Sequence, residues 1–262
     1  MKIVEIMCSY HCFIKNTVLI ISFLLLEAQA ASIVVEDSNE ISKLNPYTAK
    51  YTVSRGDNKY GNATRILSEN STTYTLTFNT NASMFFYSIE TLQTSTFLWQ
   101  ENKIIPLIYK GKDARTFKDD KNLQLSFNHE QSILTVEKSG QKQEEKLSYG
   151  LLDPLLAYEA IRLKAIAHDK NFNVKNLQYM IYDLGGIKEY NFINSGPFIV
   201  ETSLGEVNCI KLSRIRKNSD RKTHVWLAVD YDYIPIKILQ ENNNEEVATL
   251  AITSLVQSKE LK

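Results

Sequence analysis

From Tyr47 onward, apolar residues recur at every second position, and this alternation is typical of β-strands that bury one face. Residues 47–53 are an example, because Tyr, Ala, Tyr and Val occupy the odd positions while Thr, Lys and Thr occupy the even ones. In the run 73–79, Tyr74, Leu76 and Phe78 lie on one side and threonines lie on the other. Polar turn segments separate such runs. The pattern therefore predicts roughly a dozen strands, most of them joined by short turns.

The other predicted strands follow one another along the chain with similar spacing. They cover residues 62–69, 89–99, 103–109, 123–127, 133–138, 177–182, 187–193, 198–202, 206–216, 222–229, 233–240 and 246–256. Short connections favour antiparallel pairing, since a parallel pair needs a long crossover. A sheet with this many strands should curl or close in order to bury its apolar face. We therefore predict a mainly β fold, either a large curved antiparallel sheet or an open or closed β-barrel-like meander, with one central α-helix packed against it.

The segment Leu151–His168 (LLDPLLAYEAIRLKAIAH) is the stretch with a clear helical pattern. Asp153 is suited to accept hydrogen bonds from the first free backbone N–H groups, and Pro154 fits the next position. Apolar residues lie on two nearly opposite faces, which predicts a helix that is covered on two sides. One face is formed by Leu155, Leu156, Ala160, Leu163, Ile166 and Ala167, and the other by Tyr158, Ile161 and Ala165. Glu159 and Arg162 interrupt these faces at a spacing that lets them pair.

The first thirty residues are typical of a secretory signal peptide. The apolar run at residues 18–26 follows a weakly basic leader, and Ala28-Gln29-Ala30 is a suitable cleavage site. A membrane span needs about 20 apolar residues, so this run is too short to remain as an anchor. We expect export across the inner membrane to the periplasm, with no transmembrane span after cleavage. The expected parts are a signal peptide (1–30), a flexible lead-in (31–46), a single β-rich domain (47–256) and a tail (257–262).

Charge and cysteine content limit the classes of partner and of stabilising bond. The 30 basic and 30 acidic residues give a formal net charge of zero, so nothing indicates a nucleic-acid partner. After the expected cleavage Cys209 is the last cysteine left, so the domain forms no internal disulfide and depends on its core. Cys209 lies in a strand-like run and is expected to be a buried apolar residue.

Several short motifs occur in order along the chain. They are Tyr51-x-Val53-Ser54, Gly61-x-Ala63-x-Arg65-x-Leu67, Pro106-x-x-Tyr109 with Gly111 and Arg115, Gly150-Leu-Leu-Asp153-Pro154-Leu155, Thr202-x-Leu204-Gly205, Val225-Trp226-Leu227-Ala228-x-Asp230 and Tyr233-Ile234-Pro235-Ile236-Lys237-Ile238. Together they resemble a family of exported bacterial proteins described as domain of unknown function 3108 (DUF3108), over about residues 47–256. The resemblance implies a periplasmic, mostly antiparallel β protein and carries no catalytic residues. By analogy between folds, its expected relatives are the lipoprotein carriers of the bacterial envelope, in which a helical lid covers an apolar cavity.

Residues that could do chemistry are sparse. The mature sequence has no His or Cys spacing of a zinc site, no glycine-rich phosphate loop and no G-x-S-x-G elbow. We therefore expect no metal, no cofactor and no catalytic residues. His224 and Asp230 are the best candidates for acid–base work, and a hydrolase is the third hypothesis for function. A histidine on the solvent-facing side of a strand is the more common interpretation of His224.

Aromatic residues recur along the predicted strands and the helix, and an apolar lining of this kind is what a lipid cavity needs. The candidate ligand-binding residues are Tyr51, Tyr74, Phe78, Phe97, Tyr158 and Trp226. The leading hypothesis is non-enzymatic binding of an apolar ligand, as in a lipid or lipoprotein-like carrier of the cell envelope. A solid aromatic core would be equally compatible with the pattern.

The alternative hypothesis is an envelope protein–protein interaction or sensor module with such a solid core. It would act through a sheet edge or through the apolar cluster Met84–Tyr87. The expected structure of this cluster is a loop that tucks into the core. The possible partners are thus a lipid or an envelope protein, and the sequence leaves the oligomeric state open.

Overall fold

The computed structural model describes residues 43–168, 172–216 and 219–258. Its strands form one fourteen-stranded sheet in the order β8-β7-β6-β5-β4-β3-β2-β1-β14-β13-β12-β11-β10-β9, and every pair in it is antiparallel. Most neighbours are consecutive along the chain, as short turns predict. The exception is the pair β1–β14, which joins two meanders in the middle of the sheet.

The elements are long, and α1, the one α-helix among the described residues, separates the two meanders. The strands of the first meander are β1 (Tyr47–Arg55), β2 (Asn58–Asn70), β3 (Thr73–Met84), β4 (Tyr87–Gln100), β5 (Lys103–Arg115), β6 (Lys118–Asn128), β7 (Ile133–Lys138) and β8 (Gln141–Lys146). The remaining elements are α1 (Leu156–Ala167), β9 (Asn176–Asp183), β10 (Gly186–Thr202), β11 (Gly205–Ile215), β12 (Lys222–Ala228), the 3-10 turn η2 (Val229–Tyr231), β13 (Ile234–Asn242) and β14 (Glu245–Gln257).

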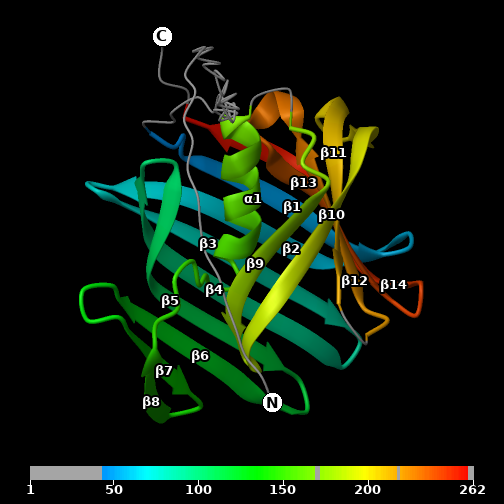
Figure 1. The fold of residues 1–262 in the computed structure, drawn as a ribbon. Helices are drawn as coiled ribbons and strands as arrows, with labels where there is room; N and C mark the ends of the chain where they lie inside the picture. The colour runs from blue at the N-terminus through cyan, green and yellow to red at the C-terminus, as the bar shows by residue number, and fades with distance from the viewer. Residues whose placement is uncertain (1–42, 169–171, 217–218, 259–262) are drawn as a thin grey trace, which may run out of the picture. The chain divides into compact units, whose positions relative to one another are not determined.

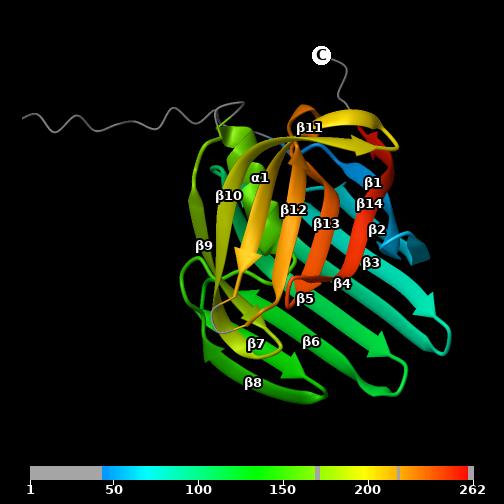
Figure 2. The same ribbon diagram turned by 90° about the vertical axis from the view of Figure 1, so that its right-hand side faces the viewer.

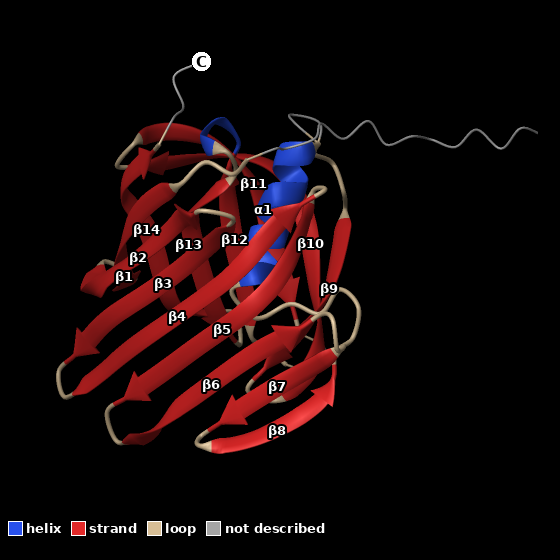
Figure 3. Cartoon of the chain, turned by 90° about the vertical axis from the view of Figure 1, so that its left-hand side faces the viewer, coloured by secondary structure: helices blue, strands red, loops and turns tan. Residues whose placement is uncertain are grey.

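The sheet curls around α1, so that strands of both meanders face the helix (Figure 1). Seen from the side, β10–β13 lie in front of the helix, β3–β5 lie behind it, and β7 and β8 lie below it (Figure 2). The cartoon coloured by secondary structure shows the helix enclosed between these strands (Figure 3). The predicted fold class is therefore confirmed, with the sheet in the open form: within the described residues, β8 and β9 form its two ends and no ladder joins them.

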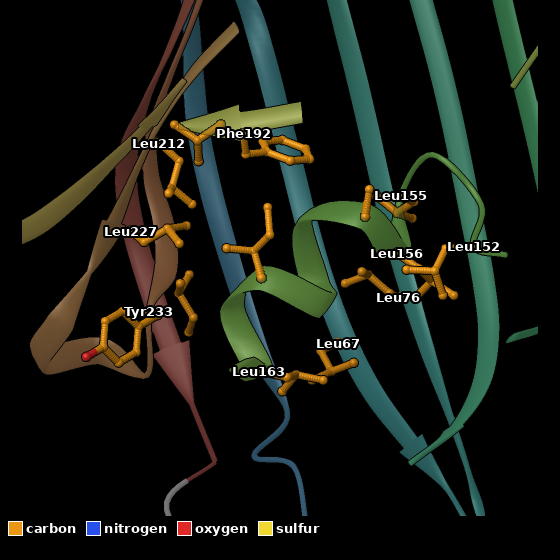
Figure 4. Close-up of a cluster of buried hydrophobic side chains, with 14 of the residues drawn as sticks. Leu67, Leu76, Leu152, Leu155, Leu156, Leu163, Phe192, Leu212, Leu227 and Tyr233 are labelled. Atoms are coloured by element: carbon orange, nitrogen blue, oxygen red, sulfur yellow. The ribbon is translucent and has the colours of Figure 1, made fainter. Parts of the chain in front are cut away.

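The core fills the space between the helix and the concave face of the sheet. Leu156 and Leu163 of the helix are 0% and 1% exposed, so the predicted burial of Leu163 is confirmed. Figure 4 shows the helical leucines between side chains from β2 and β3 on one side and from β10–β12 on the other. The side chains from the sheet that contribute to this cluster include Leu67, Leu76, Phe192, Leu212 and Leu227. The helix is thus covered on two sides, as its two apolar faces predict.

The start of the helix follows the predicted chemistry, although the first helical residue is Leu156. Oδ1 of Asp153 accepts hydrogen bonds from the backbone N–H groups of Leu155 and Leu156, each at 2.9 Å. The hydroxyl of Ser95 on β4 donates a third bond to the same oxygen at 2.8 Å. Asp153 therefore satisfies two free donors of the first turn and also ties that turn to the sheet.

Some predicted strands and turns differ from the structure. The cluster Met84–Tyr87 does not tuck into the core; it forms the β3–β4 turn, where Phe85 is 97% exposed and Phe86 is 88% exposed. The predicted turn at residues 56–61 is shorter, since β2 begins at Asn58. β8 lies in a polar segment (QKQEEK) that carries no alternation, which is why the pattern does not predict it. In contrast, the face of β1 formed by Tyr47, Ala49, Tyr51 and Val53 is buried as predicted.

The segment between β8 and α1 covers part of the free edge of β9. Leu152 forms an isolated parallel bridge with Ile181, in which its N–H donates to Met180 and its carbonyl accepts from Tyr182. The hydroxyl of Tyr182 also donates to Oε1 of Glu145 on β8 at 2.9 Å. These contacts form a seam that brings the two ends of the sheet together without closing it. A cavity lies beside this seam.

Candidate ligand cavity beside the helix

A cavity of about 870 Å³ lies between the helix and the seam. Its walls come from the β4–β5 hairpin (residues 99–106), His129 and Ser132 of the β6–β7 turn, the segment 147–152, the helix and the start of β9 (residues 176–179). The helix contributes Ala160, Leu163 and Lys164. The volume lies in the range of roughly 300–1,000 Å³ that is typical of small-molecule sites. The cavity is therefore large enough for an organic ligand and uses residues from both ends of the sheet.

The walls of this cavity are mainly apolar and the charged groups are few. The apolar lining includes Trp99, Ile104, Pro106, Leu151, Leu177 and Tyr179. Burial raises the pKa of Tyr179 to about 12, so its phenol stays neutral at physiological pH. The charged lining residues are Glu101, Lys103 and Lys164, and the first two are exposed. Such a site suits an apolar ligand better than an ion.

The helix wall of the cavity is held in place by a buried ionic group formed by Arg65, Glu159 and Arg162. Nη2 of Arg65 on β2 lies 3.0 Å from Oε2 of Glu159, and Nε of Arg162 donates to Oε1 at 2.8 Å. Burial opposes ionisation of Glu159, but the two guanidinium groups outweigh it and hold the pKa of this carboxyl below its usual value. The Glu159–Arg162 pair is confirmed, whereas the contribution of Arg65 is new.

Further bonds connect this ionic group to other elements. Arg65 donates through Nε to the hydroxyl of Tyr47 at 2.8 Å. Arg162 donates through Nη1 to the carbonyl of Asp232, also at 2.8 Å, and its guanidinium lies 5.2 Å from the centre of the Tyr47 ring. The group therefore connects the helix to β1, to β2 and to the turn before β13, and it fixes where the helix lies against the sheet.

The structure places the six aromatic residues predicted for ligand binding in three different settings. Tyr51, Tyr74 and Phe97 are buried in the core, where the rings of the last two stack 5.8 Å apart. Phe78 and Tyr158 line a second, smaller cavity at the N-terminal end of the helix. Trp226 lies between Lys211 and Lys237, each 5.1 Å from its ring, and is 8% exposed. None of the six lines the larger cavity, and their role in binding stays a prediction.

The aromatic residues that do line the larger cavity were within reach of the sequence. Trp99 follows Phe97 by two positions, so the alternation of β4 places both on the same face of the strand. Tyr179 occupies the same kind of position between Leu177 and Ile181 on β9. The pattern could therefore have named them as inner-face residues. It could not show that the helix leaves space beside them.

The candidate acid–base residue His224 belongs to a row of polar side chains on three neighbouring strands. Its Nδ1 lies 2.7 Å from Oγ of Ser213 on β11, and its Nε2 lies 3.1 Å from Oε2 of Glu241 on β13. Asp230 hydrogen-bonds Asn208 instead. Neither cavity at the helix is lined by any member of the row. Ser213 is on a strand whose backbone pairs on both sides, so its neighbours offer no free N–H groups for an oxyanion hole.

The part of the chain that the structure describes has neither a metal-binding cluster nor a membrane-spanning helix. No group of three or more His, Cys, Asp or Glu side chains there is arranged to hold a metal ion. No helix there has the length and apolar content needed to cross a bilayer. Cys209 is buried, as predicted, and burial raises the pKa of its thiol to about 12.

A curled antiparallel sheet around one helix, with an apolar cavity between them, defines a β-barrel-like fold. The chain belongs to the family described as "Protein of unknown function (DUF3108)", whose model matches residues 47–251. It is also similar to a solved structure described as a beta-barrel-like protein of domain of unknown function DUF1849 from Brucella abortus. That similarity has a TM-score of 0.54 and 11% identity and covers 83% of this chain and 100% of that one, so it supports the fold. No curated protein matches the chain.

Proposed function

We propose that this protein is an exported, non-enzymatic binding protein of the bacterial periplasm that takes an apolar ligand, such as the acyl chain of a lipid, into the cavity beside α1. The observation that carries the proposal is the cavity itself, about 870 Å³ in volume and lined mainly by apolar side chains. Leu151, Leu152 and Leu163 form part of that lining and are at most 5% exposed, so a ligand in contact with them would be shielded from water.

The non-enzymatic part of the proposal is supported by the setting of the most reactive-looking side chains. Ser213, His224 and Glu241 resemble a hydrolase triad in spacing, but they lie on three paired strands outside both cavities at the helix. A triad needs donors aimed at the developing oxyanion and a place for the substrate. In a strain that lacks the native gene, we expect the Ser213→Ala variant to restore every phenotype of the deletion as fully as the native protein does.

Ligand binding is tested by filling the cavity with a larger side chain. Ala160 lines it, whereas Ala251 on β14 is exposed and does not line it, so Ala160→Phe and Ala251→Phe form a matched pair. The neutral dye N-phenyl-1-naphthylamine serves as the probe, and native mass spectrometry of protein from its own periplasm looks for a co-purified lipid. We expect Ala160→Phe to weaken dye binding by about tenfold or more, with Ala251→Phe unchanged. Equal dye uptake by both variants, with no co-purified lipid, would contradict the proposal.

Export is tested separately, because it depends on residues outside the described ones. We expect the full-length protein expressed in a bacterium to appear in the periplasmic fraction with Ala31 as its first residue. A double substitution of Ala28 and Ala30 by bulky residues should block this cleavage. Recovery of the uncleaved chain from the cytoplasm would contradict this part of the proposal.

A second candidate function, docking to an envelope protein, is favoured by three exposed phenylalanines at neighbouring hairpin tips. Phe85 and Phe86 in the β3–β4 turn are 97% and 88% exposed, and Phe117 in the β5–β6 turn is 86% exposed. The two tips are joined because the N–H of Thr116 donates to the carbonyl of Ser88 at 3.0 Å. Contiguous exposed apolar residues often mark interaction surfaces.

A photo-crosslinking residue in place of Phe86 tests this candidate, and one in place of Asn243 in the β13–β14 turn is the control. We expect a specific adduct from position 86 only, and its loss when Phe85 and Phe117 are replaced by serine. Indistinguishable adducts from both positions would exclude docking through these tips. This outcome would leave the cavity proposal unaffected, since the tips do not line the cavity.

A further inference from the structure

The second cavity at the helix lies at its N-terminal end and has a different chemistry from the first. It has a volume of about 200 Å³ and shares no lining residue with the cavity of 870 Å³. Pro154, Leu155 and Tyr158 close one side, and residues of β2–β4 and β10–β13 form the rest. Backbone N–H groups at the start of a helix carry partial positive charge, which favours an anion nearby.

Two arginines, Arg214 and Arg216, give this cavity its charge. Arg214 is the last but one residue of β11 and follows Leu212 on the inner face of the sheet, while Arg216 lies two residues further along. The side chain of Arg214 is held rather than free: it is 9% exposed, and its guanidinium carbon lies 3.0 Å from the centre of the Tyr190 ring. Stacking on an aromatic ring leaves the edge of a guanidinium open for hydrogen bonding.

Among the residues that the structure describes, no carboxylate balances these two charges. Within the described part of the chain, neither Arg214 nor Arg216 has an Asp or Glu within ion-pair distance, and the lining of the cavity contains no acidic residue. Burial, followed by the nearby charges of Arg214 and Arg221, lowers the pKa of Arg216. Arg65 also lines the cavity, but Glu159 already pairs with it. The cavity therefore contains two guanidinium groups that repel each other and are partly shielded from water.

The other polar groups around the two arginines can complete the coordination of a small oxyanion. Gln93, Tyr158, Tyr190, Thr223 and Gln240 line the same cavity and can donate from amides or hydroxyls. A neighbouring hollow of about 460 Å³ shares Gln93 and Pro154 with it and is lined further by the basic residues Lys112, Lys121, Lys188 and Arg221 and the acidic residues Asp113 and Asp183. Lys188 pairs with Asp183 at 2.9 Å, but the basic residues outnumber the acidic ones, so the hollow gives an anion an approach of net positive charge.

We propose that the cavity at the N-terminal end of α1 is a binding site for a phosphoryl group, held between the guanidinium groups of Arg214 and Arg216. Planar guanidinium groups bind phosphate oxygens in pairs, which is why arginine is common in such sites. The phosphoryl group could come from free phosphate or from the headgroup of a phospholipid. The proposal is independent of the one made for the larger cavity, because the two sites have separate walls.

Isothermal titration calorimetry with the mature protein in a phosphate-free buffer tests the proposal. The probes are inorganic phosphate and dodecyl phosphate, and the variants are Arg214→Gln, Arg216→Gln and the double variant. Arg55→Gln removes the same charge from an exposed strand end and serves as the control. We expect each single substitution to weaken binding about tenfold, the double variant to lose binding, and the control to match the native chain. Arg214→Lys and Arg216→Lys, which keep the charge but lose the paired geometry, should bind at an intermediate level.

The outcomes separate the two sources. Binding of inorganic phosphate that depends on both arginines supports the proposal with free phosphate as the ligand. Binding of dodecyl phosphate alone, with the same dependence, supports it with a lipid headgroup as the source. Failure of both probes to bind, or equal binding by the double variant, overturns it. Circular dichroism of each variant confirms that a loss of binding is not a loss of fold, and N-phenyl-1-naphthylamine uptake should be unchanged in all of them.

Discussion

Two sets of arginines lie near the same helix, and their surroundings are opposite; all but the half-buried Arg216 are buried. Arg65 and Arg162 share Glu159, with ion-pair distances of 3.0 and 2.8 Å. Arg214 and Arg216 line the cavity at the N-terminal end of that helix, which has no acidic residue in its lining. In the first set both guanidinium groups pair with the same carboxylate, although Nη2 of Arg162 is buried without a hydrogen bond to any described residue. The second presents its charges to an open space.

This difference indicates which buried or half-buried charges stabilise the fold and which are available to bind a ligand. Desolvating a charge is costly, so a buried cation is retained either because a fixed anion compensates it or because it has a use. Replacing a residue of the paired set (Arg65, Glu159 or Arg162) should therefore lower the free energy of unfolding strongly. Replacing Arg214 or Arg216, the unpaired set, should lower it little. The predictions below test that contrast in order of the expected effect of each substitution at a fixed pH.

The largest effect is expected for Glu159→Gln. This change leaves two buried guanidinium groups, Arg65 and Arg162, without a carboxylate, so the free energy of unfolding should fall by about 3–5 kcal/mol. Urea denaturation of the variant measures it, and Glu206→Gln, at an exposed strand end, should differ from the native chain by less than about 0.5 kcal/mol. A loss below about 1 kcal/mol for Glu159→Gln would mean that the paired set does not hold the helix.

The sequence predicted the parts of this arrangement that are local. The spacing of Glu159 and Arg162 predicts their ion pair, and the position of Asp153 before Pro154 predicts the first hydrogen bonds of the helix. The alternation over residues 47–53 gives the buried face of β1. These features depend on neighbours within a few positions, which the period of a strand or helix fixes. The same patterns gave the fold class.

The parts that could not be predicted depend on contacts between distant strands. Arg65 lies 94 positions before Glu159, and only the curl of the sheet brings them together. A signal was present, because Arg65 alternates with Ala63 and Leu67, as Arg214 does with Leu212, and a charged residue on an apolar face needs a partner. Phe85 and Phe86 were misplaced because apolar composition favours burial, whereas a tight turn between long strands exposes them.

The next effect is expected for Leu163→Ala, which removes apolar contact from the helix without touching a charge. Leu163 is 1% exposed, and its truncation should lower the free energy of unfolding by about 2–3 kcal/mol. The lower part of the usual range applies because the residue already borders the larger cavity. Leu92→Ala on β4, where the side chain is 45% exposed, is the control for the same truncation. A melting temperature lowered by only a degree or two would instead indicate a helix that moves as a lid.

A third test concerns Asp153, a buried acid with no cation beside it. Burial raises its pKa to about 7 from 3.8, even though three hydrogen bonds reach Oδ1. Because the folded protein holds this proton more tightly than the unfolded chain, the stabilisation is full below pH 3.8 and is lost as the pH rises through about 7. Asp153→Asn keeps the acceptor but cannot ionise.

The difference in unfolding free energy between the native chain and Asp153→Asn should therefore change with pH. Relative to the variant, the native chain should lose on the order of 4 kcal/mol between pH 4 and pH 8. Urea denaturation at a series of pH values measures this difference, and Asp57→Asn in the exposed β1–β2 turn is the control. A difference that stays constant with pH would show that Asp153 ionises normally in the folded protein.

The smallest effect is expected for Arg216→Gln in the absence of any phosphate. Because Arg214 and Arg221 act on Arg216 as like charges, removing one of these cations relieves repulsion. The free energy of unfolding should stay within about 0.5 kcal/mol of the native value, with a slight gain at low salt that disappears at high salt. Arg65→Gln, measured beside it, should lose at least about 3 kcal/mol, because it breaks a buried pair. If Arg216→Gln were instead destabilised by more than about 1 kcal/mol at both salt concentrations, its guanidinium would be a partner within the fold. The contrast between the two sets of arginines would then fail, and with it the reason for expecting a ligand between them.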